Sequence, residues 1–347
     1  MKQVLDIPSE LSSIQQWVLD GLVDVIDEIE RALHSDVPAV AALCKQVEQY
    51  RGKMLRPTLV LVSGAACGVP TDQPPTGDLL RLAAVVEMVH MATLVHDDIL
   101  DEAQIRRRAQ TINDKAGNEA AVLLGDYLIA ASFRLCASLD DPEPSRQIGK
   151  VSMELCEGEL LQIQNRDNLS IDEATYYEIL EGKTAALVGA STALGARAGG
   201  ASQQIQATMD TFGKSIGVAF QVQDDLLDLL GTEEVVGKTL GRDLKKGKLT
   251  LPLIHHLASL DAEPRAGSLV LLEEASETHA ISSSHAETQT YTRQLIEALR
   301  GTGSLEYAKS SAESLVTKAK AALIPLDESP ARAVLELLAD AVLTRDR

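Results

Sequence analysis

Aromatic residues are scarce in this sequence. Only 3% of the 347 residues are Phe, Trp or Tyr, and the alternation of apolar and polar residues that is typical of strands is also rare. Helix-forming residues dominate instead. The composition therefore predicts an all-α fold. We expect a single domain over residues 1–347, because no short-period repeat and no long linker divides the chain.

The chain also lacks an excess of positive charge. Its formal net charge is −19 at pH 7, and a charge of this sign repels nucleic acid and anionic membrane surfaces. Nucleic acid is therefore excluded as a general partner. A bound anion must be held by local basic residues or by metal ions.

Cysteines are few, and long uncharged runs are missing. The four cysteines are Cys44, Cys67, Cys136 and Cys156. They show no C-x-x-C spacing and lie in apolar segments, which predicts reduced core thiols. The longest uncharged runs, 57–71 and 184–196, are too short and glycine-rich to span a bilayer, and residues 1–13 lack an apolar leader. We expect a cytoplasmic protein without an integral membrane segment.

Helical periodicity is present along most of the chain. It predicts helices over residues 9–34, 36–50, 55–67, 77–101, 115–139, 145–164, 172–198, 202–230, 250–260, 289–300, 304–323 and 329–344. Two segments carry almost no charge: residues 82–95 contain only Glu87, and residues 215–222 contain no charged residue. A helix that is apolar on all sides is buried, so both segments are predicted to lie inside a bundle.

These two apolar helices end in acidic clusters with the same D-D-x-x-D pattern. The clusters are Asp97, Asp98 and Asp101, and Asp224, Asp225 and Asp228. The first and last Asp of each cluster share one helix face. Carboxylates without a matching His or Cys pattern suit a hard ion, and Mg²⁺ is commonly bound by one or two carboxylates together with substrate phosphates. The clusters predict a magnesium site, with a pair of solvated helix ends as the alternative.

Basic segments lie close to the acidic clusters in the sequence. Residues 106–108 follow the first cluster, residues 237–248 follow the second, and a third basic segment occupies residues 51–57. Acidic clusters that bind metal beside basic loops that bind phosphate are what a diphosphate held through Mg²⁺ requires. The third segment has no acidic cluster of its own, so it could hold a second anion without metal.

Taken together, these motifs resemble those of the trans-type polyprenyl diphosphate synthase family, and the residues around Ala92 resemble those of the long-chain subgroup of that family. The resemblance covers about residues 50–255, with a weaker similarity at residues 303–308. It is carried by residues 87–102 with Arg106-Arg107, residues 125–128, Gly158-Glu159 with Gln162, Lys183-Thr184, residues 220–228, Gly237-Lys238 and residues 247–252. The sequence departs from the family at Arg51-Gly52-Lys53-Met54, where Gly-Gly-Lys-Arg is usual, and at Arg108, where Gly is usual.

The resemblance implies a fold and a reaction. The fold would be one large helical bundle of the isoprenoid synthase type around a central cavity. The enzyme would condense isopentenyl diphosphate head-to-tail onto an allylic diphosphate, with Mg²⁺ as cofactor and in a homodimer. The isopentenyl double bond would attack the allylic carbocation, and a proton would then be lost to the departing pyrophosphate.

The resemblance also implies roles for individual residues. All six aspartates would bind Mg²⁺ and the allylic diphosphate, with further donors from Arg106, Lys183, Lys238 and Lys248. Isopentenyl diphosphate would be held by Lys53, Arg56, His90 and Arg107. Thr184 and Gln221 would direct oxygen atoms at the carbocation. His96 is expected to make a structural hydrogen bond, and a core histidine is the alternative for His90.

Small residues precede the first cluster. Turns counted back from Asp97 reach Thr93 and Val89, with Ala92 beside them. In the family, small residues here accompany long products, so the resemblance implies a product longer than geranylgeranyl. A farnesyl or geranylgeranyl diphosphate synthase is the alternative, since Ala92 and Thr93 could simply permit close helix packing.

Two further functions compete with elongation. A class I terpene cyclase also ionises an allylic diphosphate, but such enzymes commonly use aromatic faces to stabilise cations, and this chain has few. A non-catalytic synthase subunit would be expected to lose part of an acidic cluster, Lys53 or Arg56, and all of these residues are present. Elongation is the preferred interpretation.

Overall fold

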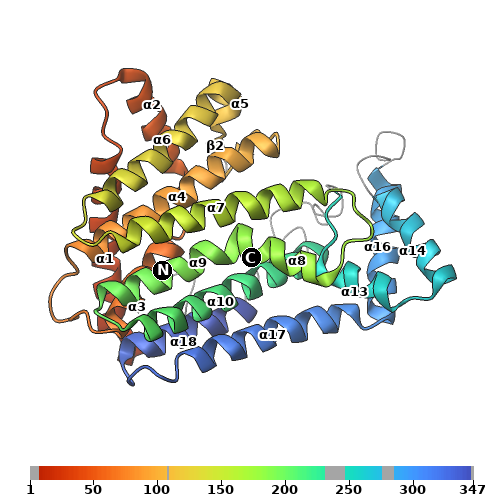
Figure 1. Cartoon of the computed structure of the whole chain (residues 1–347). Coiled ribbons are helices and arrows are strands. Elements are labelled where there is room, and N and C mark those ends of the chain that lie inside the picture. The colour runs from red at the N-terminus through yellow and green to blue at the C-terminus, as the bar shows by residue number, and fades with distance from the viewer. Residues whose placement is uncertain (1–7, 108, 231–246, 276–284, 345–347) are drawn as a thin grey trace. The chain divides into compact units, whose positions relative to one another are not determined.

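Helices form almost all of the regular structure in the computed structural model (Figure 1). The structure describes residues 8–107, 109–230, 247–275 and 285–344. Its only strands in these ranges are β1 (Ile105–Arg106) and β2 (Ala109–Gln110), which pair antiparallel. The prediction of an all-α fold is confirmed. Arg108, Gly237 and Lys238 lie outside the described residues.

The chain divides into two compact units. The first unit comprises residues 1–153, 187–213 and 322–338, and the second comprises residues 154–186, 214–321 and 339–347. Helices α7 (Glu143–Gln164), α10 (Gln203–Leu230) and α18 (Pro330–Leu343) contribute residues to both units. The single domain stays a prediction.

The first unit contains the N-terminal helices. They are η1 (Ser9–Leu11), α1 (Ser12–Ala32), α2 (Pro38–Val47), η2 (Glu48–Tyr50), α3 (Leu55–Ala66), α4 (Asp78–Leu100), α5 (Ile112–Ala116) and α6 (Asn118–Ala137), with most of α9 (Ala186–Ala198). Helix α4 packs against α1, α3 and α6, and its apolar residues between Leu82 and Val95 are almost all buried. Burial of this segment was predicted from its lack of charge.

Helices α3 and α9 approach each other closely. A Cβ atom added at Gly195 of α9 would overlap the carbonyl oxygen of Val60 in α3 and lie 2.9 Å from the Cβ of Ser63. Only glycine permits this distance between the helices. Because Leu59, Val60 and Leu61 are fully buried, α3 is enclosed by its neighbours.

Helices α4 and α6 also satisfy the length and hydropathy criteria for a membrane span among the described residues. The most apolar stretch is 67% buried within the protein in α4 and 39% buried in α6. Buried core helices satisfy the same criteria, so these two helices are weak evidence for a membrane segment.

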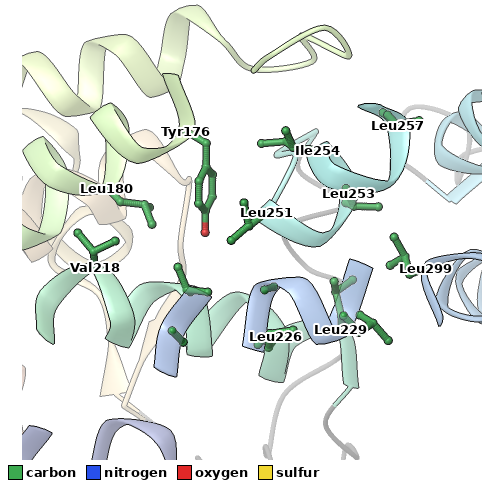
Figure 2. Close-up of a cluster of buried hydrophobic side chains, with 14 of the residues drawn as sticks. Tyr176, Leu180, Val218, Leu226, Leu229, Leu251, Leu253, Ile254, Leu257 and Leu299 are labelled. Carbon is green, nitrogen blue, oxygen red and sulfur yellow. The ribbon is translucent and has the colours of Figure 1, made fainter. Parts of the chain in front are cut away.

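The second unit has its own apolar core. Its helices are α8 (Glu173–Leu180), the π-helical turn η3 (Glu181–Ala185), α13 (Leu251–Ser259), α14 (Ala262–Ala275), α16 (His285–Gly301) and most of α17 (Ser304–Ala322). Figure 2 shows Tyr176 standing between Leu180 and Leu251, with its hydroxyl turned toward α10. The core therefore places a tyrosine hydroxyl beside the helix that carries the second acidic cluster.

The observed helices agree with the predicted ranges to within a few residues at most ends, with three exceptions. The β1–β2 hairpin, α5 and α14 were not predicted. The strands have two residues each, and α5 has five, which is too short for a period to be recognised. The prediction that all four cysteines are core thiols is wrong for Cys156, which is exposed on α7 because its face of the helix is not covered by the described residues.

Candidate active site

The first acidic cluster lies at the C-terminal end of α4. Asp97 is half-buried and Asp98 is buried, both in the last turn, and Asp101 follows the helix and is exposed. The backbone N–H of Asp101 donates to the carbonyl of Asp97 at 2.8 Å, which continues the helical turn. The outer two aspartates are thus nearer to solvent than the central one.

Asp98 is fully engaged with protein groups. The hydroxyl of Tyr50 donates to its Oδ2 at 2.6 Å, and Arg106 donates to its Oδ1 from Nε at 2.8 Å and from Nη2 at 2.7 Å. The guanidinium carbon of Arg106 also lies 5.8 Å from the centre of the Tyr50 ring. Asp98 raises the pKa of Arg106 above its ordinary value despite burial. The predicted diphosphate donor Arg106 is therefore charged and fixed in place.

The segment after the cluster folds back onto it. The backbone N–H of Ile112 donates to the hydroxyl oxygen of Tyr50 at 3.2 Å. The side-chain amide of Asn113 donates to the carbonyls of Asp98 and Ala103 at 3.2 and 3.1 Å. The side chain of Thr111 caps α5. This chain reversal positions Arg106.

Three arginines, Arg51, Arg56 and Arg107, act electrostatically on one buried carboxylate, that of Glu87. Glu87 is 2% exposed; burial raises its pKa, and Arg56, Arg107 and Arg51 oppose that shift. Burial lowers the pKa of Arg56, whereas Glu87 raises it. The Nε atom of Arg56 is buried without a hydrogen-bond partner in the described part of the chain. An anion at this position would satisfy it.

His90 is electrostatically coupled to two of these arginines, Arg56 and Arg107. Its pKa is held well below the ordinary value, first by burial and then by Arg56, Arg107 and Arg106. The imidazole is therefore neutral at pH 7. The structure thus places three of the residues predicted to bind isopentenyl diphosphate, Arg56, His90 and Arg107, in one electrostatically coupled group.

The guanidinium of Arg107 occupies the space beside Gly52, in the basic segment 51–57. A Cβ atom at Gly52 would overlap the guanidinium of Arg107, and Arg107 donates a hydrogen bond to the carbonyl of Tyr50. Lys53 beside it is exposed. Met54, where the family usually has Arg, is buried and left-handed, with φ of 53°.

The second acidic cluster repeats the arrangement of the first. Asp224 and Asp228 are half-buried in the last two turns of α10, and Asp225 is buried. The hydroxyl of Tyr176 donates to Oδ2 of Asp225 at 2.7 Å, and the side-chain amide of Gln221 donates to its Oδ1 at 3.1 Å. The amide of Gln221, predicted to face the carbocation, is oriented by this bond.

Lys183 and Thr184 lie in the π-helical turn η3, and both are half-buried. Lys183 makes a close ion pair with Glu159 of α7, whose other carboxylate oxygen accepts from the amide of Gln162 at 3.0 Å. A Cβ atom at Gly158 would overlap the backbone of Lys183. π-Helical turns are frequent at functional sites; the functional role of Lys183 stays a prediction.

The remaining predicted residues are placed as follows. Lys248 is half-buried. Val89 and Ala92 are fully buried, and the half-buried Thr93 donates to the carbonyl of His90 at 2.8 Å. His96 lies 3.3 Å from the carbonyl of Val122, so the predicted structural hydrogen bond of His96 is confirmed.

The donor set suits a hard divalent cation bound together with an anionic ligand. No group of three or more His, Cys, Asp or Glu side chains within the described ranges is arranged to hold a metal by itself. Each cluster offers two outer carboxylates, and Mg²⁺ commonly takes one or two carboxylates and completes its shell with phosphate oxygens and water. The residues therefore fit a divalent ion that arrives with a diphosphate.

Known structures share this fold. A polyprenyl synthase from Caulobacter crescentus, solved in complex with calcium and isoprenyl diphosphate, superposes with a TM-score of 0.84; it is 30% identical, and 97% of this chain and 98% of that chain are covered. The fold is thus that of a polyprenyl synthase.

The sequence relationships agree. The chain matches the polyprenyl synthetase family over residues 37–287 and belongs to that family. It is 34% identical to the heptaprenyl diphosphate synthase component 2 of Bacillus subtilis, over 81% of this chain and 82% of that protein. It is 31% identical to the octaprenyl diphosphate synthase of Escherichia coli, over 97% and 99%. The prediction of a trans-prenyltransferase is confirmed, and the family binds diphosphates through a divalent metal.

Three residues of the site were not predicted: Tyr50, Tyr176 and Glu87. Tyr50 and Tyr176 precede their aspartate partners by 48 and 49 residues, and no local pattern marks such a pairing. The role of Glu87 could have been predicted from its position. A single carboxylate within an apolar helix is buried with the helix, and a buried carboxylate needs a cationic partner.

Proposed function

We propose that this protein condenses isopentenyl diphosphate onto an allylic diphosphate to make a linear trans polyprenyl diphosphate longer than geranylgeranyl, with Mg²⁺ as its metal. The observation that supports it best is the contrast between two kinds of anion site. The acidic clusters need a metal before they can attract a diphosphate, whereas the group around Arg56 carries its own positive charge. This contrast supports two different diphosphate sites, one that depends on metal and one that does not.

The allylic diphosphate is assigned to the acidic clusters. Asp97 and Asp101, and Asp224 and Asp228, would hold Mg²⁺. When bound, the metal stabilises the charge that develops on the departing pyrophosphate. Arg106, Lys183 and Lys248, together with Lys238 outside the described residues, would add donors to its oxygens. The ion pair of Lys183 with Glu159 holds the ammonium in place until a stronger anion competes for it.

Isopentenyl diphosphate is assigned to Arg56, Arg107, Lys53 and His90. The buried Nε of Arg56 and the guanidinium of Arg107 supply fixed donors, and a neutral His90 can donate one hydrogen bond. The oxygens of Thr184 and Gln221 would face the allylic carbocation. The proton lost after attack by the double bond is assigned to the departing pyrophosphate.

The purified chain incubated with Mg²⁺, farnesyl diphosphate and radiolabelled isopentenyl diphosphate tests this function. A labelled linear lipid longer than geranylgeranyl is expected. A cyclic product would support a terpene cyclase, and a product of geranylgeranyl length or shorter would support a short-chain synthase. Absence of turnover would support a subunit that needs a partner, a possibility suggested by the two-component name of the Bacillus relative.

Product length is assigned to Ala92, Thr93 and Val89. Ala92→Phe is expected to shorten the product, because a bulky ring would fill space close below the first cluster. Leu94→Phe, at a half-buried position on the same turn, serves as the matched control and should leave the length unchanged. If Ala92→Phe does not fold, Thr93→Phe at a half-buried position replaces it. An unchanged product in a folded variant would contradict the assignment.

A homodimer and a cytoplasmic location complete the proposal. Apolar side chains at a coiled-coil-like spacing are exposed on α7: Met153 and Leu160 are each 65% exposed, Ile163 is 38% exposed, and Cys156 lies between them. A second copy would cover this stripe. Light scattering should give twice the chain mass, and Leu160→Glu should lower this mass.

The four free cysteines support the proposed cytoplasmic location, because disulfides are rare in reducing compartments.

A further inference from the structure

Both acidic clusters have a tyrosine bonded to their central aspartate. Tyr50 donates to Oδ2 of Asp98 at 2.6 Å, and Tyr176 donates to Oδ2 of Asp225 at 2.7 Å. In both pairs the hydrogen bond is buried, and the tyrosine precedes its partner by 48 or 49 residues. The same contact is thus built twice, from different elements.

The second carboxylate oxygen is also held in each case. Oδ1 of Asp98 accepts from two nitrogens of Arg106, and Oδ1 of Asp225 accepts from the amide of Gln221. Asp98 is 1% exposed and Asp225 is 4% exposed. A buried carboxylate is costly unless its oxygens are hydrogen-bonded. These contacts compensate the burial and leave the central aspartates turned toward protein groups.

The outer aspartates are placed differently. Asp97, Asp224 and Asp228 are half-buried, and Asp101 is exposed. Successive residues of an α-helix differ by about 100° in direction. A bond that fixes the direction of Asp98 therefore also fixes the face on which Asp97 lies, and the bond to Asp225 does the same for Asp224 and Asp228.

We propose that Tyr50 and Tyr176 are positioning residues that hold the central aspartates away from the metal and thereby set the outer aspartates in place to bind it. The proposal rests on the proposed function, since it assigns Mg²⁺ to the outer carboxylates. It also separates two roles within a pattern whose aspartates look equivalent in sequence. Tyr50 additionally supports Arg106 through their shared partner Asp98 and through the ring contact.

The test uses Tyr50→Phe and Tyr176→Phe, which remove only the hydroxyl. Mg²⁺ is titrated in the presence of inorganic pyrophosphate by calorimetry, and the Mg²⁺ concentration for half-maximal turnover is measured separately. Loss of a buried hydrogen bond to a charged group corresponds to about a tenfold change in an equilibrium constant. We expect each variant to need about tenfold more Mg²⁺ in both measurements, with much of the turnover recovered at saturating Mg²⁺.

Tyr307→Phe is the matched control. Tyr307 donates to both carboxylate oxygens of Glu173 at 2.8 and 2.9 Å. The variant therefore removes a similar hydrogen bond whose acceptor belongs to neither acidic cluster, and its Mg²⁺ dependence should match that of the unchanged protein. An unchanged Mg²⁺ affinity in the folded Tyr50→Phe and Tyr176→Phe variants, or an equal loss in Tyr307→Phe, would overturn the proposal.

The double variants Tyr50→Phe/Asp98→Asn and Tyr176→Phe/Asp225→Asn add a second criterion in the calorimetric titration. If each tyrosine acts through its aspartate, the double variant should bind Mg²⁺ no more weakly than the aspartate variant alone; additive losses would overturn the proposal.

The failure of the proposed function can be told apart from the failure of the positioning role. If the unchanged protein does not elongate isopentenyl diphosphate, the proposed function fails, whereas the pyrophosphate titrations still measure the effect of each tyrosine on Mg²⁺ affinity. Turnover with unaltered titrations in the variants would refute the positioning role alone.

Discussion

Gly52 shows how the absence of one carbon atom can set the position of Arg107, which is proposed to bind isopentenyl diphosphate. A Cβ at this site would overlap the guanidinium of Arg107, which is the mobile end of a long side chain. In Gly52→Ala we therefore expect the fold to remain while Arg107 moves and loses its bond to the carbonyl of Tyr50. The KM for isopentenyl diphosphate should rise about tenfold, as for loss of a charged hydrogen bond, and steady-state kinetics measures it.

A surface glycine provides the control for Gly52→Ala. Gly267 is exposed on α14, and outside the helix's own backbone no atom of the described residues lies within 4 Å of an added Cβ there. Gly267→Ala should leave the KM unchanged and stabilise α14 slightly. An equal rise in KM in both variants would show that the effect at Gly52 is not local.

His256 makes stability depend on pH. It is 1% exposed, lies 2.8 Å from the hydroxyl of Thr302 and 2.9 Å from that of Ser268, and burial, with His255 nearby, lowers its pKa below the ordinary 6.5. The unfolded chain therefore binds the proton more readily. Its contribution to stability is complete above pH 6.5 and falls as the pH drops toward the lower pKa of the folded state.

The variant His256→Gln isolates this contribution. At pH 7.5 it should unfold with about 2 kcal/mol less free energy than the unchanged protein, because one buried and one partly buried hydrogen bond are altered. Denaturant titrations between pH 7.5 and 5 should show this difference shrinking below pH 6.5. A difference that stays constant over the range would argue against a lowered pKa at His256.

At the residue scale, the sequence indicates a role where a residue type leaves few chemical choices. The repeated aspartates predict a metal site because clustered carboxylates require a cationic partner, whereas Arg56 was assigned through the family resemblance, and both assignments stay predictions. The tyrosine partners of the aspartates could not be predicted. Nothing near Tyr50 or Tyr176 in the sequence indicates Asp98 or Asp225, since these contacts arise from tertiary packing over 48 and 49 residues.

At the scale of elements, the junction of α7 with η3 depends on glycine. The backbone of Gly182 and Lys183 lies against Gly158, and a Cβ there would overlap Lys183 and lie 2.8 Å from the carbonyl carbon of Gly182. Because backbone atoms cannot rotate away, Gly158→Ala should cost about 2 kcal/mol of unfolding free energy. It should also lower kcat by displacing Lys183. Denaturant unfolding and turnover measure the two effects.

Gly149→Ala on the same helix is the comparison for Gly158→Ala. Its added Cβ would meet the ring of Phe133 at 3.8 and 3.9 Å, which is ordinary contact. Stability should stay the same or rise, since alanine favours a helix. If Gly149→Ala were destabilised as strongly as Gly158→Ala, helix α7 would be sensitive to any added atom.

Helices with a strong apolar pattern were predictable and weakly patterned ones were not. Helical periodicity predicted helices over residues 77–101 and 202–230, where the structure has α4 and α10. Helix α14 was missed because its charged and apolar residues do not separate onto two faces. The turn η3 was included in a longer predicted helix, since a change from α to π geometry depends on packing such as that at Gly158.

At the scale of the whole molecule, the net charge of −19 opposes the binding of a diphosphate. The basic group around Arg56 is a local exception, and the acidic clusters add to the repulsion. That both clusters act on one diphosphate stays a prediction. The charge nevertheless implies that most of the affinity for an allylic diphosphate must come with divalent cations, which neutralise both the ligand and the carboxylates.

Metal removal tests this balance. Inorganic pyrophosphate with Mg²⁺ should raise the melting temperature by several degrees, since a ligand at 100 times its Kd adds about 2.7 kcal/mol. With EDTA present, pyrophosphate should raise it far less, because it can reach only the metal-independent group at Arg56. Asp101→Asn, which removes an exposed carboxylate, should lower the shift seen with Mg²⁺ and leave the small EDTA shift unchanged. Equal shifts with and without metal would mean that the arginine group, and not the acidic clusters, carries diphosphate binding.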